Sequence, residues 1–226
     1  MSNVFYSCQY IKTLDLRSLD VHSVTNMRSM FSGCTALTSL DLSHFNTSKV
    51  ADMSSMFYAL TSLTSLDVSH FNTSNVTNMK EMFDRCTALT SLDLSHFNTS
   101  NVTDMNNMFL LCKSLTSLDL SSWDTSRVND MGYMFMSCSS LTTLDLSGWN
   151  VSNVFNMSQM FFSCKSLTTL DLSGWEMRSN VDLNSLFGNC YRLSKIKMIG
   201  CNDATINKIK EQLTAAGKNS VRIITE

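Results

Sequence analysis

The chain has 226 residues, of which 43% are hydrophobic, so it is long enough to bury a substantial core. Its formal net charge of −2 gives it no general attraction to nucleic acid or to anionic membranes, and we expect neither as a partner. The sequence shows no signal-peptide pattern and no apolar run of about 18 residues, so we expect no membrane insertion. Proline is absent, which argues against rigid or flexible Pro-rich linkers.

The sequence repeats itself with a fixed period of 26 residues. Leu63–Ser74 recurs as Leu89–Ser100, and variants follow at the same spacing. Full repeats begin at residues 11, 37, 63, 89, 115, 141 and 167, and an eighth beginning at Leu193 soon diverges. Such a period predicts a solenoid, in which each repeat is one structural unit that stacks on its neighbours. Because residues 1–8 align with residues 27–34, we expect further repeats before Met1 in the intact protein.

Each repeat contains one segment with a period of two and one with a helical period. Leu40 and Leu42 alternate with Asp41, the pattern of a half-buried strand. Met79, Met82, Phe83 and Cys86 stand at i, i+3, i+4 and i+7, and Ser74, Thr77 and Asn78 before them are candidate N-caps. We therefore predict an α/β solenoid with a parallel sheet on its concave side and short helices on its convex side.

The C-terminal segment departs from the repeat. Residues 203–216 read as an amphipathic helix that Gly217 ends, and residues 221–224 read as a short strand. The sequence thus predicts a solenoid over residues 1–200 and a helix-strand cap over residues 201–226.

A resemblance to a known family rests on three motifs. They are Leu-Thr-Ser-Leu-Asp-(Leu/Val)-Ser, then Phe-Asn-Thr-Ser-Asn-Val-Thr-Asn-Met, then Met-Phe and Cys, as at residues 63–86. Over residues 1–200 the chain resembles the BspA-like leucine-rich-repeat surface proteins of bacteria, which include mycoplasma-type surface lipoproteins. The resemblance implies a right-handed leucine-rich-repeat solenoid and a secreted or surface-anchored, adhesin-like protein that binds host or neighbouring-cell molecules.

One repeat position carries cysteine in seven repeats, with Leu60 in the missing place. The row is Cys8, Cys34, Cys86, Cys112, Cys138, Cys164 and Cys190. Because leucine substitutes for cysteine, and because stacked side chains project in parallel, we predict buried free thiols in preference to disulfides or a metal site. Cys201 lies outside the row and is expected to be the most reactive thiol. The methionines, and the row Phe45, Phe71, Phe97, Trp123, Trp149 and Trp175, are interpreted as core.

A row of aspartates is the first candidate binding site. The Asp row comprises Asp15, Asp41, Asp67, Asp93, Asp119, Asp145 and Asp171, and Lys197 ends it. Neighbouring carboxylates repel one another, so two interpretations arise. Either hydroxyls such as those of Ser39, Ser43 and Ser65 bind the carboxylates, with an upward pKa shift, or a basic, cationic or hydroxyl-rich partner docks there. The candidate residues are Asp41, Ser43, His44, Asp67, Ser69, His70, Asp93, Ser95, His96, Asp119 and Asp145. The histidines could sense pH or bind a metal, although ordinary surface histidine is the simpler interpretation.

An apolar group on the other side is the second candidate. The residue after the core phenylalanine is Ser32, Tyr58, Asp84, Leu110, Met136 and Phe162 in successive repeats. Leu110, Met136 and Phe162, with Tyr133, would form either a protein contact patch or a surface partly buried beneath adjacent loops.

The sequence favours a non-catalytic, monomeric scaffold for a protein or glycan ligand, without metal or cofactor. Catalysis needs differently tuned groups at one locus, whereas the candidate Asp, His and Cys residues have near-equivalent copies. An intracellular adaptor or effector, suggested by the unpaired thiols, is the alternative. A lattice binder such as an ice-binding protein fits the Thr-Ser rows but not the charged face beside them.

Overall fold

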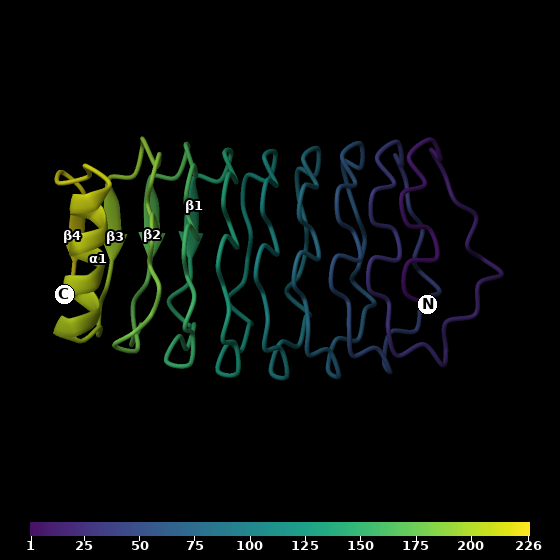
Figure 1. Cartoon of the computed structure of the whole chain (residues 1–226), viewed down its shortest axis with the longest axis horizontal. Coiled ribbons are helices and arrows are strands. Elements are labelled where there is room, and N and C mark those ends of the chain that lie inside the picture. The colour runs from purple at the N-terminus through teal and green to yellow at the C-terminus, as the bar shows by residue number, and fades with distance from the viewer.

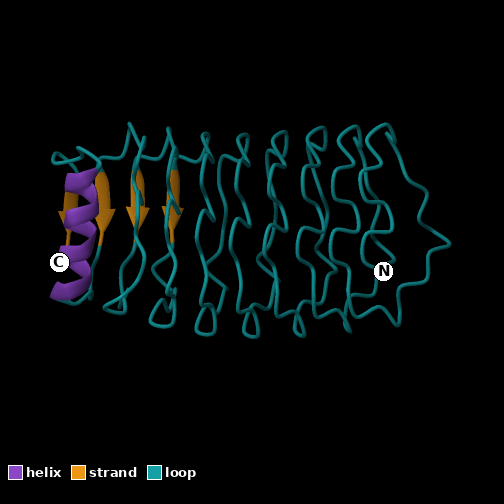
Figure 2. Cartoon of the chain, viewed as in Figure 1, coloured by secondary structure: helices purple, strands orange, loops and turns teal.

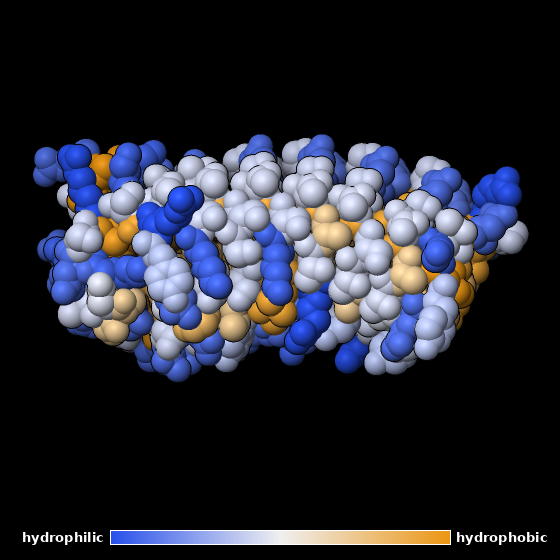
Figure 3. Space-filling view, turned by 90° about the horizontal axis from the view of Figure 1, so that it is seen from above, coloured by the Kyte–Doolittle hydropathy of each residue, from blue (hydrophilic) through white to orange (hydrophobic).

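Each 26-residue repeat forms one coil, and the coils stack from the N-terminal end to a C-terminal helix (Figure 1). The computed structural model describes all residues, 1–226. Parallel bridges join Asn26 to Asp52, Asp52 to Asn78 and so on to Asp182, so equivalent residues of successive coils are neighbours. The predicted repeat is confirmed. The stack is nearly straight in the views of Figures 1 and 3, so we name its two sides by their residues and not as concave and convex. The Asp face carries the Asp row, and the turn side carries residues 79–86 and their equivalents in the other coils.

Four short strands form one parallel sheet in the order β1-β2-β3-β4 at the C-terminal end (Figure 2). They are β1 Thr143–Asp145, β2 Thr169–Asp171, β3 Lys195–Lys197 and β4 Arg222–Ile224. The prediction of one strand in every repeat is wrong for the earlier coils. In the four coils directly before β1 a serine, such as Ser91, replaces the threonine that begins β1 and β2, and serine lacks the β-branch that favours extended backbone. The first coil carries Thr13 at this position and also forms no strand, so the serine accounts for only those four coils. The alternation of side chains nevertheless persists, with Leu94 buried and Asp93 exposed.

The predicted short helices of the convex side are also wrong, because their place is taken by consecutive turns. Met79, Met82, Phe83 and Cys86 are buried as expected, but Glu81 and Arg85 have φ angles of 58° and 61°. Every second N–H, such as that of Glu81, donates to a carbonyl of the next coil, while the N–H groups between them bond within the coil. A helix requires each N–H to bond four residues back and excludes such left-handed residues. The fold therefore has the expected buried positions without the helices of an α/β solenoid.

The C-terminal cap is close to the prediction. Helix α1 spans Asp203–Ala215, and the Asn202 side chain accepts the N–H of Thr205 at its N-terminus. Ile206, Ile209 and Leu213 are buried. The Thr205 hydroxyl also accepts the N–H of Met177, which ties α1 to the last coil, and β4 pairs with β3.

Stacked aromatic rings run through the core of the coils. Eight phenylalanines spaced 26 residues apart, from Phe5 to Phe187, have ring centroids 5.5–6.0 Å apart with nearly parallel planes. The second aromatic row is buried too, and its three tryptophans donate their indole N–H to backbone carbonyls of the preceding coil. Met27 and Met30 are fully buried like their counterparts. The interpretation of both aromatic and methionine rows as core is confirmed.

The cysteine row consists of free thiols, as predicted. Six of its members are buried, and each donates to a backbone carbonyl of the preceding coil, as Cys112 does to Phe83 at 3.1 Å. Burial raises the pKa of Cys86 to about 12 and that of Cys190 to about 11. Burial raises the pKa of the half-buried Cys201 as well, so its electrostatic environment does not activate it.

Thiol labelling tests this burial. We expect a maleimide at pH 7.5 to modify Cys8 and Cys201 in the folded protein, because these two thiols are half-buried, and the other six only after unfolding in guanidinium chloride. Mass spectrometry counts the adducts, and Cys201→Ala should lower the native count by one. Rapid modification of any of the six buried thiols in the folded state would contradict this arrangement.

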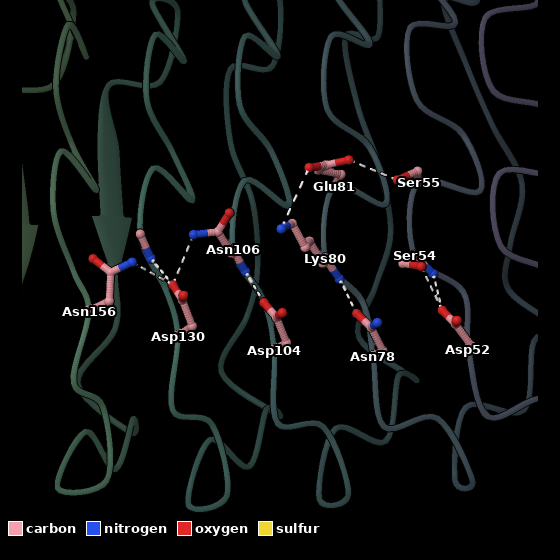
Figure 4. Close-up of polar contacts among 11 residues, drawn as sticks. Asp52, Ser54, Ser55, Asn78, Lys80, Glu81, Asp104, Asn106, Asp130 and Asn156 are labelled. Atoms are coloured by element: carbon pink, nitrogen blue, oxygen red, sulfur yellow. Dashed lines mark hydrogen bonds and ion pairs between the residues drawn. The ribbon is translucent and has the colours of Figure 1, made fainter.

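A second polar ladder, which the sequence analysis missed, runs along the turn side (Figure 4). Its members are Asn26, Asp52, Asn78, Asp104, Asp130, Asn156 and Asp182, and each accepts the backbone N–H two residues later. Asp130 Oδ1 also accepts Nδ2 of Asn106 and of Asn156, both at 2.9 Å. Burial, aided by the nearby Asp130, raises the pKa of Asp104. The ladder thus joins adjacent coils through amide–carboxylate contacts.

Gly132 leaves room for these amides. A Cβ at this position would lie 2.5 Å from Asn156 Nδ2 and 3.0 Å from Asn106 Nδ2. We expect Gly132→Ala to displace both donors and to lower the free energy of unfolding by about 1–3 kcal/mol, measured by chemical denaturation. The matched control is Gly148→Ala, whose Cβ would meet nothing closer than Ser121 O at 3.8 Å. Equal free energies of unfolding for the two variants would contradict this role of the ladder.

Candidate functional site

The carboxylates of the Asp row lie on the Asp face, exposed except at the half-buried Asp171, and each is held by the residue two positions later. Asp93 Oδ1 accepts the backbone N–H of Ser95 at 3.0 Å and its hydroxyl at 2.7 Å. Asp41, Asp67, Asp119 and Asp145 accept the corresponding N–H at 2.9–3.1 Å. Turns of this kind fix the direction of the carboxylate without covering it. The structure thus places the predicted Asp and Ser residues in one regular array.

The expected upward pKa shift is wrong. The backbone N–H and hydroxyl of the following serine stabilise the charged form, so they lower the pKa of Asp41, Asp67, Asp93 and Asp119. Ser43 is one of these partners, whereas Ser39 and Ser65 make no hydrogen bond to the Asp row. These four carboxylates are therefore ionised at neutral pH.

Cations neutralise the row only at its ends. At the N-terminal end, Arg17 Nη2 lies 2.6 Å from Asp15 Oδ2, and its hydrogen bonds lower the pKa of Asp15 to about 2. At the C-terminal end, Lys197 Nζ lies 3.0 Å from Asp171 Oδ2. The five aspartates between them, from Asp41 to Asp145, have no ion-pair partner. The middle of the Asp face consequently presents uncompensated negative charge.

The candidate histidines at the edge of this face are partly engaged in the fold. Nε2 of His70 lies 2.6 Å from the Leu42 carbonyl, and Nε2 of His96 lies 2.7 Å from the Val68 carbonyl. His44 makes no such bond and packs edge-on against Phe45. The structure brings no three His, Cys, Asp or Glu side chains together as a metal-ligand group. Two of the three histidines therefore link neighbouring coils through their rings.

The apolar group on the turn side is half-buried. Leu110, Tyr133, Met136 and Phe162 each keep only part of their surface exposed. The Phe162 ring lies over Gly188 of the next coil, where a Cβ would approach it to 2.6 Å. Seen from above in Figure 3, the surface is mostly polar, with hydrophobic colour in small separate areas. This arrangement agrees with the expectation of partial burial beneath neighbouring segments.

Asp84, in the same row of positions, breaks the repeat in a way that sequence reasoning missed. It is 3% exposed, and its Oδ1 is the one buried side-chain polar atom without a hydrogen-bond partner. Arg85 Nε is 3.9 Å from that oxygen. Burial raises the pKa of Asp84 to about 7. The only sequence signal is that an acid occupies a position held by Tyr58 in the preceding coil and Leu110 in the following one.

Three solved structures of bacterial proteins are similar to this chain, and two of them are described as leucine-rich-repeat proteins. A protein from Leptospira interrogans is 14% identical, with a TM-score of 0.47, covering 88% of this chain and 45% of that one. A protein from Bacteroides ovatus is 16% identical, with a TM-score of 0.41, covering 86% and 51%. The functional domain of InlJ from Listeria monocytogenes, which includes a cysteine ladder, is 19% identical, with a TM-score of 0.33, covering 95% and 46%. The chain thus spans about half the length of these proteins.

A comparison with curated proteins found no significant match. Helix α1 is too short and too polar to cross a bilayer, and the structure has no other helix. The family comparison gives a direct assignment, because one family model matches residues 1–93 and again residues 87–198, which together make up most of the chain. The chain belongs to the DUF285 family, described as mycoplasma protein of unknown function.

Proposed function

We propose that this chain is a non-catalytic binding scaffold of a bacterial cell-surface or secreted, adhesin-like protein. It docks a host or neighbouring-cell protein or glycan on the Asp face. The observation that carries this proposal is the stretch from Asp41 to Asp145, whose carboxylates are exposed and have no ion-pair partners. Such a row suits a partner that presents repeated basic or hydroxyl groups, since each coil adds one more equivalent contact.

The regularity of the face supports binding over chemistry. Asp67, Asp93 and Asp119 of the middle coils form the same turn, and each accepts the N–H of a serine two residues later, so their surroundings are nearly equivalent. The buried cysteines have raised pKa values, which oppose formation of the nucleophilic thiolate. The resemblance of the repeat to BspA-like leucine-rich-repeat proteins supports the surface location and the right-handed coil.

The double variant Asp93→Asn with Asp119→Asn tests the Asp face. Each asparagine keeps the Oδ1 acceptor for Ser95 or Ser121, so the melting temperature should stay close to that of the wild type while two negative charges disappear. In a glycan array and a panel of immobilised host-matrix proteins, we expect the variant to bind its wild-type target at least about tenfold more weakly.

The control is Glu211→Gln with Glu226→Gln, which removes two exposed negative charges at the C-terminal cap, outside the Asp row. It should bind like the wild type. Unchanged binding of the Asp93/Asp119 variant, or an equal loss in the control, would remove the Asp face as the docking surface.

A further inference from the structure

A polar pocket of about 430 Å³ lies on the turn side in the N-terminal half. Its wall comes from successive coils and includes Tyr6, Arg28, Tyr58, Glu81, Asp84 and Arg85. The pocket lies among consecutive turns whose backbone is fixed by hydrogen bonds to the next coil, so its shape is set by the stack. Its volume falls within the usual range for sites that take small molecules.

One lining residue of this pocket, Asp84, has a buried oxygen atom without a hydrogen-bond partner. The side chain is buried and lines the pocket, and its Oδ1 accepts no hydrogen bond from the protein. An unsatisfied buried acceptor costs stability, and the fold does not require an acid here, because Leu110 occupies the equivalent place in the next coil. A ligand that donates a hydrogen bond to Oδ1 would satisfy it.

The other lining groups narrow the chemistry of that ligand. Arg28 and Arg85 would repel a cation, while Glu81, together with Asp84 in its ionised form, would repel an anion. Glu81 Oε2 already accepts the Ser55 hydroxyl at 2.9 Å, and its Oε1 lies 4.0 Å from Lys80 Nζ (Figure 4). Neutral hydroxyl groups match such a mixture of donors and acceptors, because each hydroxyl can both donate and accept.

The pocket wall also contains an aromatic ring. The Tyr58 ring lines the pocket, and the Arg85 guanidinium lies 5.9 Å from its centroid. A ring of this kind offers an apolar face beside polar groups, as a ligand with both C–H and O–H surface requires. The geometry points to a saccharide pocket, in which one pyranose unit donates a hydroxyl to Asp84 Oδ1 and lies against Tyr58. This inference rests on the proposed role as a binding scaffold but assigns a site on the opposite side from the Asp face.

The test uses saturation-transfer difference NMR on the whole chain at pH 7. The probes are D-galactose, D-mannose and N-acetyl-D-glucosamine, with their methyl glycosides standing for the end of a glycan, and n-butylamine and acetate as charged probes. We expect a saturation-transfer signal from at least one sugar at millimolar concentration, and we expect no such signal from the charged probes. A response from the free sugar alone assigns the pocket to monosaccharides, and one from the methyl glycoside assigns it to glycan ends.

Asp84→Leu is the decisive variant, because it installs the residue of the next coil. This variant should have a higher melting temperature, because it removes the buried acceptor that has no partner. It should also bind the sugar at least about tenfold more weakly. Asp84→Asn provides a near-isosteric variant in case leucine disturbs folding, and it too should weaken binding. Absence of sugar binding to the wild type, sugar binding unchanged in the folded Asp84 variants, or preferential binding of the amine or acetate would overturn the proposal.

The Asp93→Asn/Asp119→Asn variant separates the two sites. It should bind the sugar as the wild type does, because both substitutions lie on the Asp face. If that variant loses macromolecular binding and the wild type binds no sugar, the Asp face remains the proposed docking surface and the pocket proposal is overturned. The reverse result would keep the pocket and remove the Asp face.

Discussion

The backbone hydrogen bonds between coils on the turn side set the conformation of every repeat. Alternate N–H groups, such as those of Glu81 and Phe83, donate to the next coil, while those between them close turns within their own coil. This division fixes the left-handed residues, keeps the phenylalanine rings in register and aligns the amide–carboxylate ladder of the turn side. Each coil depends on its neighbours for half of these bonds, which explains why a single repeat would not fold alone.

Much of the fold follows from the pattern of apolar residues, because burial depends on which side chains can leave water. The period, the buried methionines, cysteines and aromatic rings, and the C-terminal helix were all predictable. The turns were not, since the spacing of Met79, Met82 and Phe83 fits a helix equally well. One signal was present: Gly33 and Asn107 occupy left-handed positions of the turns, and both residue types tolerate positive φ.

The sequence allowed a prediction that the aspartates of the Asp face are exposed, but it did not reveal the direction of their pKa shifts. Alternation with buried leucines places Asp93 outside. Neighbouring carboxylates raise its pKa, and whether the net shift is upward or downward depends on where the next hydrogen-bond donor lies. The Asp-x-Ser spacing supplies that donor locally, so the turn overcomes the repulsion. Asp84 could not be singled out, because its row varies from coil to coil, and its missing partner shows only when the packing of Arg85 is known.

These two sites differ in how they relate to the repeat. In a solenoid each coil contacts mainly its neighbours, so a substitution at one coil is a local event that the rest of the stack tolerates. An equivalent residue in every coil gives a row whose members act together on an extended partner, as the aspartates can. A residue changed in one coil only, such as Asp84, instead creates a unique environment while the backbone stays the same. A stack of near-identical coils can therefore carry both an extended face and a discrete pocket, and the break in the repeat is where a small ligand can be selected.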